Sequence, residues 1–241
     1  MNLIRTNSYG QLSRIAAGLI AAQVNRRPDS VLGFATGGSP VGIYRQLIAL
    51  CAAGDVDFSR VRTVNLDEYA GLAADHPQSY ARFMRENLFD QINIFPGNTH
   101  IPSGLAPDVS AECRRYDELI RSLGGIDLQL LGIGHDGHIG FNEPSDHFSS
   151  GTGLVALTER TVEANKRYFS SVGEVPHTAM TMGIRDIMLA RSIVMVVSGA
   201  DKAEILRDAL TGPVTPRVPA SILQFHPNCT VIADADALAC V

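Results

Sequence analysis

The sequence predicts an α/β fold in which a Rossmann-like, mostly parallel β-sheet is flanked by helices. Short apolar runs bounded by turn residues alternate with amphipathic stretches along the chain, a pattern typical of consecutive βα units. Neither an internal repeat nor a low-complexity or linker-like segment divides the 241 residues. Because an α/β chain of this length commonly forms one domain, we expect a single domain over residues 1–241.

The periods of the apolar residues indicate where the individual elements lie. Apolar runs predict strands at residues 31–35, 61–66, 128–132, 154–157, 193–198 and 230–233. Amphipathic stretches predict helices at residues 11–24, 41–52, 79–89, 110–123, 178–189 and 202–210. Ligands bind beyond the carboxyl ends of the strands in such sheets, so the residues that follow each strand are the candidates for a binding site.

The composition excludes several classes of function. A net charge of −5 does not favour binding to nucleic acid, and an anionic substrate therefore requires a local positive site. No apolar run reaches the roughly 20 residues that cross a membrane, and residues 1–9 do not resemble a signal peptide. The four cysteines form no CxxC pair, which argues against disulfides and structural zinc. We therefore expect a cytoplasmic protein without a metal, membrane or nucleic-acid partner.

A glycine-rich loop, residues 36–40, follows the first predicted strand. Gly37 and Gly38 permit a tight turn and a close approach to a ligand, while Ser39 suits an N-cap and Pro40 the first helical turn. The free N–H groups of a helix N-terminus bind anions. No Lys-Ser or Lys-Thr pair follows, so the loop is not a Walker motif for a nucleoside triphosphate. From this loop alone, a phosphate site and an ordinary capped turn both remain open.

Two acids, Asp67 and Glu68, follow the second predicted strand. If the extended backbone continues, neighbouring side chains point to opposite sides, so at most one of the two faces a given cleft. A partly desolvated Asp67 would have a raised pKa and could act as a general base. A pair of surface acids in a loop is the alternative.

The third predicted strand leads into residues 132–144, which contain a GxGxxG pattern at Gly132, Gly134 and Gly137. A dinucleotide site of this type needs a long helix that opens at the loop. Gly140 and Pro144 interrupt the segment too soon for such a helix. The sequence therefore argues against a dinucleotide cofactor.

The same loop concentrates the titratable groups His135, Asp136, His138 and Glu143. Their spacing in a loop broken by glycines does not match a zinc pattern. Histidine titrates near neutral pH, and a carboxylate can orient its ring and stabilise its cation. We therefore favour acid–base chemistry by one histidine flanked by Asp136 and Glu143 over a structural loop histidine.

A phosphate site usually includes at least one fixed cation. Lys166 and Arg167 are candidates, and Lys202 lies just beyond the strand predicted at residues 193–198. Position after a strand favours Lys202 as a ligand-facing residue, whereas any single basic residue can also be a solvated surface group.

Taken together, the motifs resemble the glucosamine-6-phosphate deaminase family over nearly the whole chain. The matching segments, in family order, are ATGGSP (35–40), NLDEYAGL (65–72), GIGHDGHIGFNEP (132–144), LT…ANKRYF (157–169), AMTMG (179–183) and SGADKA (198–203). FNEP after DGHI is the most specific part. The related 6-phosphogluconolactonases share the fold and a DGH loop, but they continue with a Ser-Leu-Phe-Pro pattern and lack an acid equivalent to Glu143.

The resemblance implies an enzyme that converts glucosamine 6-phosphate and water into fructose 6-phosphate and ammonium in amino-sugar catabolism. Asp67 is expected to remove the C2 proton of the open-chain aminosugar. His138, oriented by Asp136 and Glu143, is expected to open the pyranose ring. No organic cofactor or metal is implied, because the amine of the substrate itself activates C2.

The resemblance also implies which residues hold the 6-phosphate of the substrate. The glycine-rich loop and two cations are expected to bind it: Gly37, Gly38, Ser39, Arg167 and Lys202.

Three positions depart from the family pattern. Many members have Ser-Arg-Thr where residues 150–152 of this chain are Ser-Gly-Thr, so Gly151 replaces an arginine. Longer, allosterically regulated members have basic residues at the positions of Gly153 and Val155. The chain also lacks the longer C-terminal tail of those members. We therefore expect a monomer or a small homo-oligomer rather than a hexamer.

Two alternative functions are compatible with the predicted fold. One is a hydrolase of the 6-phosphogluconolactonase type that uses His138 without chemistry at C2; the presence of both Asp67 and Glu143 argues against it. The other is a non-catalytic sugar-phosphate sensor, which would need a partner-binding or DNA-binding region.

Overall fold

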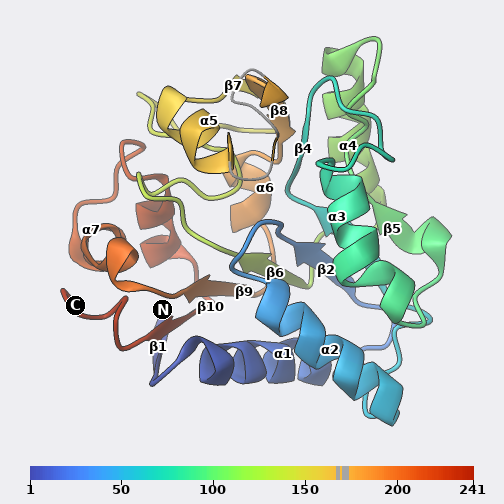
Figure 1. The fold of residues 1–241 in the computed structure, drawn as a ribbon, viewed down its shortest axis with the longest axis horizontal. Coiled ribbons are helices and arrows are strands. Elements are labelled where there is room, and N and C mark those ends of the chain that lie inside the picture. The colour runs from blue at the N-terminus through green and yellow to red at the C-terminus, as the bar shows by residue number, and fades with distance from the viewer. Residues whose placement is uncertain (167–168, 170–173) are drawn as a thin grey trace.

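A computed structural model of the chain has two β-sheets (Figure 1) and describes residues 1–166, 169 and 174–241. Within these residues the larger sheet has seven strands in the order β1-β10-β9-β6-β2-β3-β5, and all neighbours in it are parallel. Its strands are β1 (Asn2–Thr6), β2 (Val31–Phe34), β3 (Arg62–Asn65), β5 (Thr99–His100), β6 (Leu128–Leu131), β9 (Ile193–Val197) and β10 (Cys229–Asp234). The prediction of a mostly parallel α/β sheet is thus confirmed.

A smaller antiparallel sheet stands beyond the carboxyl ends of the large one. Its order is β4-β8-β7, with β4 (Asp67–Tyr69), β7 (Gly153–Ala156) and β8 (Thr178–Thr181). In Figure 1 these strands gather with α5 on the side of the large sheet opposite α1 and α2.

Helices cover both faces of the large sheet and bury two apolar cores. They are α1 (Tyr9–Arg26), α2 (Val41–Ala53), α3 (Tyr80–Asn87), α4 (Val109–Ser122), α5 (Glu159–Asn165), α6 (Ile184–Met188) and α7 (Ala203–Thr211). Side chains of α1, α2 and α3 form one core with the sheet, and side chains of α4, α6 and α7 form the other. Figure 1 shows α1 and α2 side by side under the sheet.

Strand β2 illustrates why these apolar runs became central strands. Val31 and Ala35 belong to the core under α4, α6 and α7, whereas Leu32 and Phe34 belong to the core under α1, α2 and α3. Successive side chains of a strand point to opposite faces, so a strand covered on both faces reads as a continuous apolar run.

One predicted element is wrong, and several were missed. Residues 178–189 were expected to form a helix, but Thr178–Thr181 is strand β8 and only Ile184–Met188 is helical. Ala179, Met180 and Thr181 are all buried, so the segment carries no alternating pattern that separates a short strand from a helix. Strands β1, β4 and β5 and helix α5 were missed because they are short or polar at alternate positions.

The strand order places the switch point of the large sheet beside β2. The chain passes from β2 to β3 on one side, while β6 and β9 add on the other. Crevices at such points, beyond the carboxyl ends of the strands, bind ligands in open α/β sheets. Among the described residues, no helix is long and apolar enough to span a membrane.

Asp127 lies at the amino ends of the strands, where it connects the residues just before β6, β2 and β9. We predict that the stability of the protein depends on it. Its carboxylate accepts hydrogen bonds from the Val31 amide at 2.8 Å and from Arg27 and Arg191 at 2.7 and 3.1 Å, while only 3% of the residue is exposed. We expect Asp127→Ala to lower the free energy of unfolding, measured in urea, by about 2–4 kcal/mol, because three donors lose one acceptor. Asp29→Ala, which removes only the exposed partner of Arg27, is the matched control. Equal stability of the two variants would contradict the prediction.

Candidate active site

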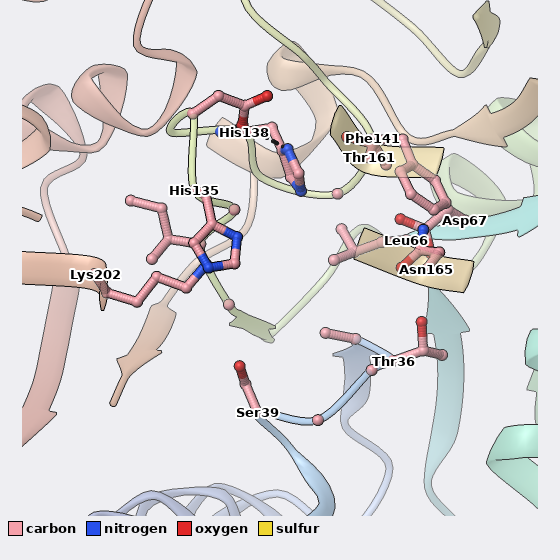
Figure 2. Close-up of a pocket in the computed structure, with 18 of the residues that line it drawn as sticks. Thr36, Ser39, Leu66, Asp67, His135, His138, Phe141, Thr161, Asn165 and Lys202 are labelled. Atoms are coloured by element: carbon pink, nitrogen blue, oxygen red, sulfur yellow. Dashed lines mark hydrogen bonds and ion pairs between the residues drawn. The ribbon is translucent and has the colours of Figure 1, made fainter. Parts of the chain in front are cut away.

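A cavity of about 280 Å³ opens where β2, β3, β6 and β9 end. Its walls are the loop after β2, the start of β4, the loop after β6, one face of α5 and the turn before α7. Figure 2 shows Lys202 and Ser39 toward one end of this cavity and Asp67 toward the other, with His138 reaching in between them. The structure thus brings together residues that the sequence places up to 167 positions apart, from Ala35 to Lys202.

The glycine-rich loop leads into the N-terminus of α2. Gly37 has φ of 82°, a left-handed conformation that glycine adopts without strain. Ser39 was expected to be the N-cap, but this prediction is wrong: Pro40 occupies the cap position and no side chain caps α2. No cap side chain therefore accepts from the first amides of the helix, although the Gly42 amide donates to the Tyr9 hydroxyl, and Ser39 lines the cavity instead. Such amides attract an anion.

The side chain of Tyr9, from α1, makes hydrogen bonds to this loop and to the start of α2. Its hydroxyl lies 2.9 Å from the carbonyl oxygen of Ser39 and accepts a hydrogen bond from the Gly42 amide at 2.8 Å. The loop conformation is therefore fixed by the protein before any ligand binds. Pre-organisation of this kind lowers the entropic cost of binding.

Of the two predicted phosphate-binding cations, Lys202 lines the cavity. It follows β9 in a short 3-10 turn, Ala200–Lys202, immediately before α7. Arg167 lies outside the described residues. Lys202 thus supplies local positive charge to a protein whose net charge is −5.

Asp67 is the most strongly perturbed acid of the cavity wall. The residue is 6% exposed, and its carboxyl accepts no hydrogen bond from another described residue. Burial, followed by the charge of Glu68, raises the pKa of Asp67 to about 8. A carboxyl with such a pKa can take up and release a proton near neutral pH. As the alternation of the strand predicts, Glu68 is absent from the described lining of the cavity.

His138 and Asp136 form the second titratable group of the site. The His138 Nδ1 atom lies 2.7 Å from Asp136 Oδ1, in a bent approach, and the His138 amide donates to the same oxygen at 3.1 Å. Burial opposes the charge of Asp136, but the hydrogen bonds and charge of His138 outweigh it and lower the pKa of Asp136 to about 2. The ring therefore lies against a carboxylate that stays ionised and can orient the imidazole.

The loop around His138 depends on glycine. A Cβ atom at Gly134 would lie 2.2 Å from the His138 ring, and Gly137 has φ of 88°. The Gly134 amide donates to the His138 carbonyl oxygen at 2.9 Å. The GxGxxG pattern thus forms a tight turn that presents a histidine, which agrees with the rejection of a dinucleotide site.

Glu143 contacts the start of α5 and not the His138–Asp136 pair. Both of its carboxylate oxygens accept from the Thr158 amide, at 3.0 and 3.2 Å, and Glu143 is absent from the described residues that line the cavity. Thr158 is the N-cap of α5. The acid therefore connects the loop after β6 to α5, and its predicted contact with His138 is not made in this arrangement.

Sequence reasoning missed the contribution of α5 and one ion pair. Arg160, Thr161 and Asn165 of this helix line the cavity, and Asn165 lies on the Asp67 side in Figure 2. His135 Nε2 lies 2.7 Å from Asp201 Oδ2 on the Lys202 side. The Thr-x-x-Thr pattern at residues 158–161, an N-cap signal, could have indicated the helix.

Metal-binding geometry is absent from the described residues, since no group of three or more His, Cys, Asp or Glu side chains is arranged to hold an ion. The described lining of the cavity includes the loop before α2, Lys202 and the titratable groups Asp67, Asp136 and His138.

Comparisons with known proteins show the family of the chain. The family model described as glucosamine-6-phosphate isomerases/6-phosphogluconolactonase matches residues 7–232. A glucosamine-6-phosphate deaminase of Lachnoclostridium phytofermentans is 58% identical over 232 residues, which are 96% of this chain and 98% of the relative. A solved monomeric glucosamine-6-phosphate deaminase is 47% identical, with a TM-score of 0.98 over the whole of both chains. A 6-phosphogluconolactonase of Shewanella baltica, 21% identical, shares the fold with a TM-score of 0.77 over 98% of each chain.

The raised pKa of Asp67 makes folding stability depend on pH. Between about pH 4 and pH 8 the native protein keeps a proton on Asp67 that the unfolded chain has released, so this contribution to stability is lost as the pH rises through that window. Asp67→Asn has no such titration. We expect the variant to be more stable than the wild type by about 2 kcal/mol or more at pH 8, and the difference to shrink toward pH 4.

Urea unfolding at a series of pH values checks this prediction, with the exposed Asp75→Asn as the control. A stability difference between Asp67→Asn and wild type that does not change with pH would contradict it.

Proposed function

Because the chain belongs to the family of glucosamine-6-phosphate isomerases and 6-phosphogluconolactonases, we infer that it deaminates glucosamine 6-phosphate. The reaction consumes one water molecule and yields fructose 6-phosphate and ammonium. The chain is thus an enzyme of amino-sugar metabolism, a hydrolase of a C–N bond that also converts an aldose into a ketose. The observation that carries this choice within the family is the buried Asp67 carboxyl, because only the deaminase reaction needs a base at C2.

The phosphate of the substrate is proposed to bind at the Ser39–Lys202 end of the cavity. The N-terminal amides of α2, whose cap residue supplies no side-chain acceptor, the open approach at Gly37 and Gly38, and the Lys202 cation support this placement. Arg167, which lies outside the described residues, remains predicted as a second cation at the same phosphate. With the phosphate held there, the sugar carbons extend toward His138 and Asp67 (Figure 2).

Ring opening is the first chemical step in this proposal. His138 transfers the proton of the C1 hydroxyl to the ring oxygen, so that the C1–O5 bond breaks and a C1 aldehyde forms. Asp136 keeps the imidazole oriented and stabilises its cation. Glu143 is proposed to join this pair, which requires its carboxylate to leave the Thr158 amide.

Proton transfer from C2 to C1 follows. The Asp67 carboxylate removes the C2 proton, and the electron pair forms a C1–C2 double bond. The electrons of the C1 carbonyl move to its oxygen, which takes up a proton from solvent to give an enolamine. Asp67 then returns the proton to C1, which leaves an imine at C2. Water adds to this imine, and the C–N bond breaks to give fructose 6-phosphate and ammonium. Each acid–base step of this kind contributes on the order of 10²–10⁴ in rate.

The remaining features of the chain fit this function. We propose that residues 1–241 act as one domain, since the family match spans residues 7–232. The monomeric state of the solved deaminase supports a monomer or small oligomer. All four cysteines are free, which supports a place in the reducing cytoplasm.

A paired assay tests the proposed function. Metal-stripped protein is expected to release ammonium and fructose 6-phosphate from glucosamine 6-phosphate in equal amounts, with or without EDTA, because the proposed steps use side chains alone. The same preparation is offered 6-phosphogluconolactone as a control substrate. Hydrolysis of the lactone without release of ammonium would overturn the proposal in favour of a lactonase.

The role of Asp67 has its own test. We expect Asp67→Asn to lower kcat by at least about 10²–10⁴-fold, while a competitive sugar-phosphate inhibitor still binds with an unchanged Kd. The amide keeps the shape of the side chain but cannot accept the C2 proton. Near-normal turnover in this variant would remove Asp67 from the base role.

A further inference from the structure

Glu68 follows the proposed base directly and makes contacts that the reaction scheme does not use. The residue is 2% exposed. One carboxylate oxygen, Oε1, accepts from the amides of Tyr69 and Tyr80, each at 2.9 Å, and the other, Oε2, accepts from the Ala81 amide at 2.9 Å. Glu68 thus has three backbone donors, whereas Asp67 has none among the described residues.

These contacts connect β4 to the N-terminus of α3. Tyr80 and Ala81 are the first two residues of that helix, and their amides would otherwise lack an intrahelical acceptor. The hydroxyl of Ser79, the N-cap, accepts from the Arg82 amide at 3.1 Å. Tyr80 also lines the catalytic cavity together with Asp67. One oxygen atom of Glu68 therefore holds both the strand of the base and a second residue of the cavity wall.

We propose that Glu68 is a positioning residue of the deaminase reaction: its carboxylate fixes β4 against α3 and places a negative charge beside Asp67. This inference rests on the proposed role of Asp67 as the base at C2. It assigns to Glu68 an effect on Asp67 and no contact with the substrate.

The donors around the two acids decide which of them ionises first. Burial is the larger effect and raises the pKa of Glu68 above its ordinary value, while its three amide donors limit that rise. Asp67 is buried without such donors, so it ionises second and against the charge of Glu68. Adjacent carboxyls whose surroundings separate their pKa values in this way take different roles. Here three amides stabilise the charge of the acid with donors, and the acid without donors is the one proposed to exchange the proton.

Other groups around Asp67 do not replace this charge. The titratable groups that interact with Asp67 from neighbouring helices, or that line the same cavity, are Tyr44, Tyr80, Tyr116, His135, Asp136, His138, Arg160, Asp201 and Lys202. Burial raises the pKa of each of the three tyrosines well above the ordinary range, so these phenols are neutral near pH 8. Besides burial, Glu68 is the cause that raises the pKa of Asp67.

The experiment compares the pH profiles of kcat and kcat/KM for wild type, Glu68→Gln and Ser79→Ala between about pH 6 and pH 10. Glu68→Gln keeps the size of the side chain but removes its charge. Its acid limb, expected near pH 8 in the wild type, should move to lower pH, and its plateau kcat should fall roughly tenfold because a weaker base transfers the proton more slowly. Ser79→Ala removes the other cap of α3 without changing the charge beside Asp67, so its acid limb should stay at the wild-type pH. Ionisation of the free substrate is common to all three proteins and cancels in the comparison.

An acid limb of Glu68→Gln that coincides with wild type would overturn the inference. Turnover by Asp67→Asn would instead overturn the proposed base, so the two failures are distinguishable. If Glu68→Gln does not fold, carboxyl-carbon NMR of the wild-type protein decides: Glu68 is expected to titrate at lower pH than Asp67, whose signal is identified by its loss in Asp67→Asn. The reverse order of titration would refute the proposal.

Discussion

The backbone of Leu66 joins the two sheets, and the site depends on that junction. Its amide donates to Phe34 of the large parallel sheet at 3.1 Å, and its carbonyl oxygen accepts from Met182, beside β8 of the small sheet, at 2.7 Å. The chain leaves one sheet and enters the other within this residue. Asp67 therefore begins β4 at the boundary between the sheets, where it is buried but still lines the cavity. A base with a pKa near 8 requires both conditions.

The two ends of the cavity have different electrostatic requirements. In the proposed reaction an acidic protein must bind a dianionic phosphate, and the groups available for this are helix amides, a serine hydroxyl and a lysine at the ends of β2 and β9. At the other end, the protein must keep a carboxyl protonatable near neutral pH, and it does so by burial and by a neighbouring carboxylate. Placing the cation far from Asp67 is consistent with both needs, because a nearby cation would lower the pKa of the base.

Helix α5 connects the catalytic loop to the cavity wall. Glu143, which follows that loop, holds the N-cap residue of α5, while Arg160 and Asn165 of the same helix face the cavity. A movement of Glu143 toward His138 would therefore break the contact between the loop and the helix. Ring opening and the position of α5 are coupled by this single carboxylate in the proposed reaction.

Much of this protein could be predicted from the order of its residues. The apolar runs of β2, β6 and β9 predicted a parallel sheet because strands buried on both faces have no polar positions, and the rule that ligands bind beyond such strands indicated Ser39, Asp67, His138 and Lys202. Prediction from the local pattern failed at β8, because its consecutive buried residues show no alternation of polar and apolar side chains. It also failed at α5, because that helix is short.

Only the tertiary structure decided the environment of each group. Asp67 and Glu68 are neighbouring acids in sequence, and nothing local separates them. Helix α3, which begins 12 residues later, supplies two amide donors to Glu68 and none to Asp67. The fold likewise placed the Glu143 carboxylate against Thr158, the N-cap of α5, rather than beside His138. Sequence thus determined which chemical groups are present and at which strand ends, whereas long-range packing decided their burial and hydrogen-bond donors, and through these their pKa values.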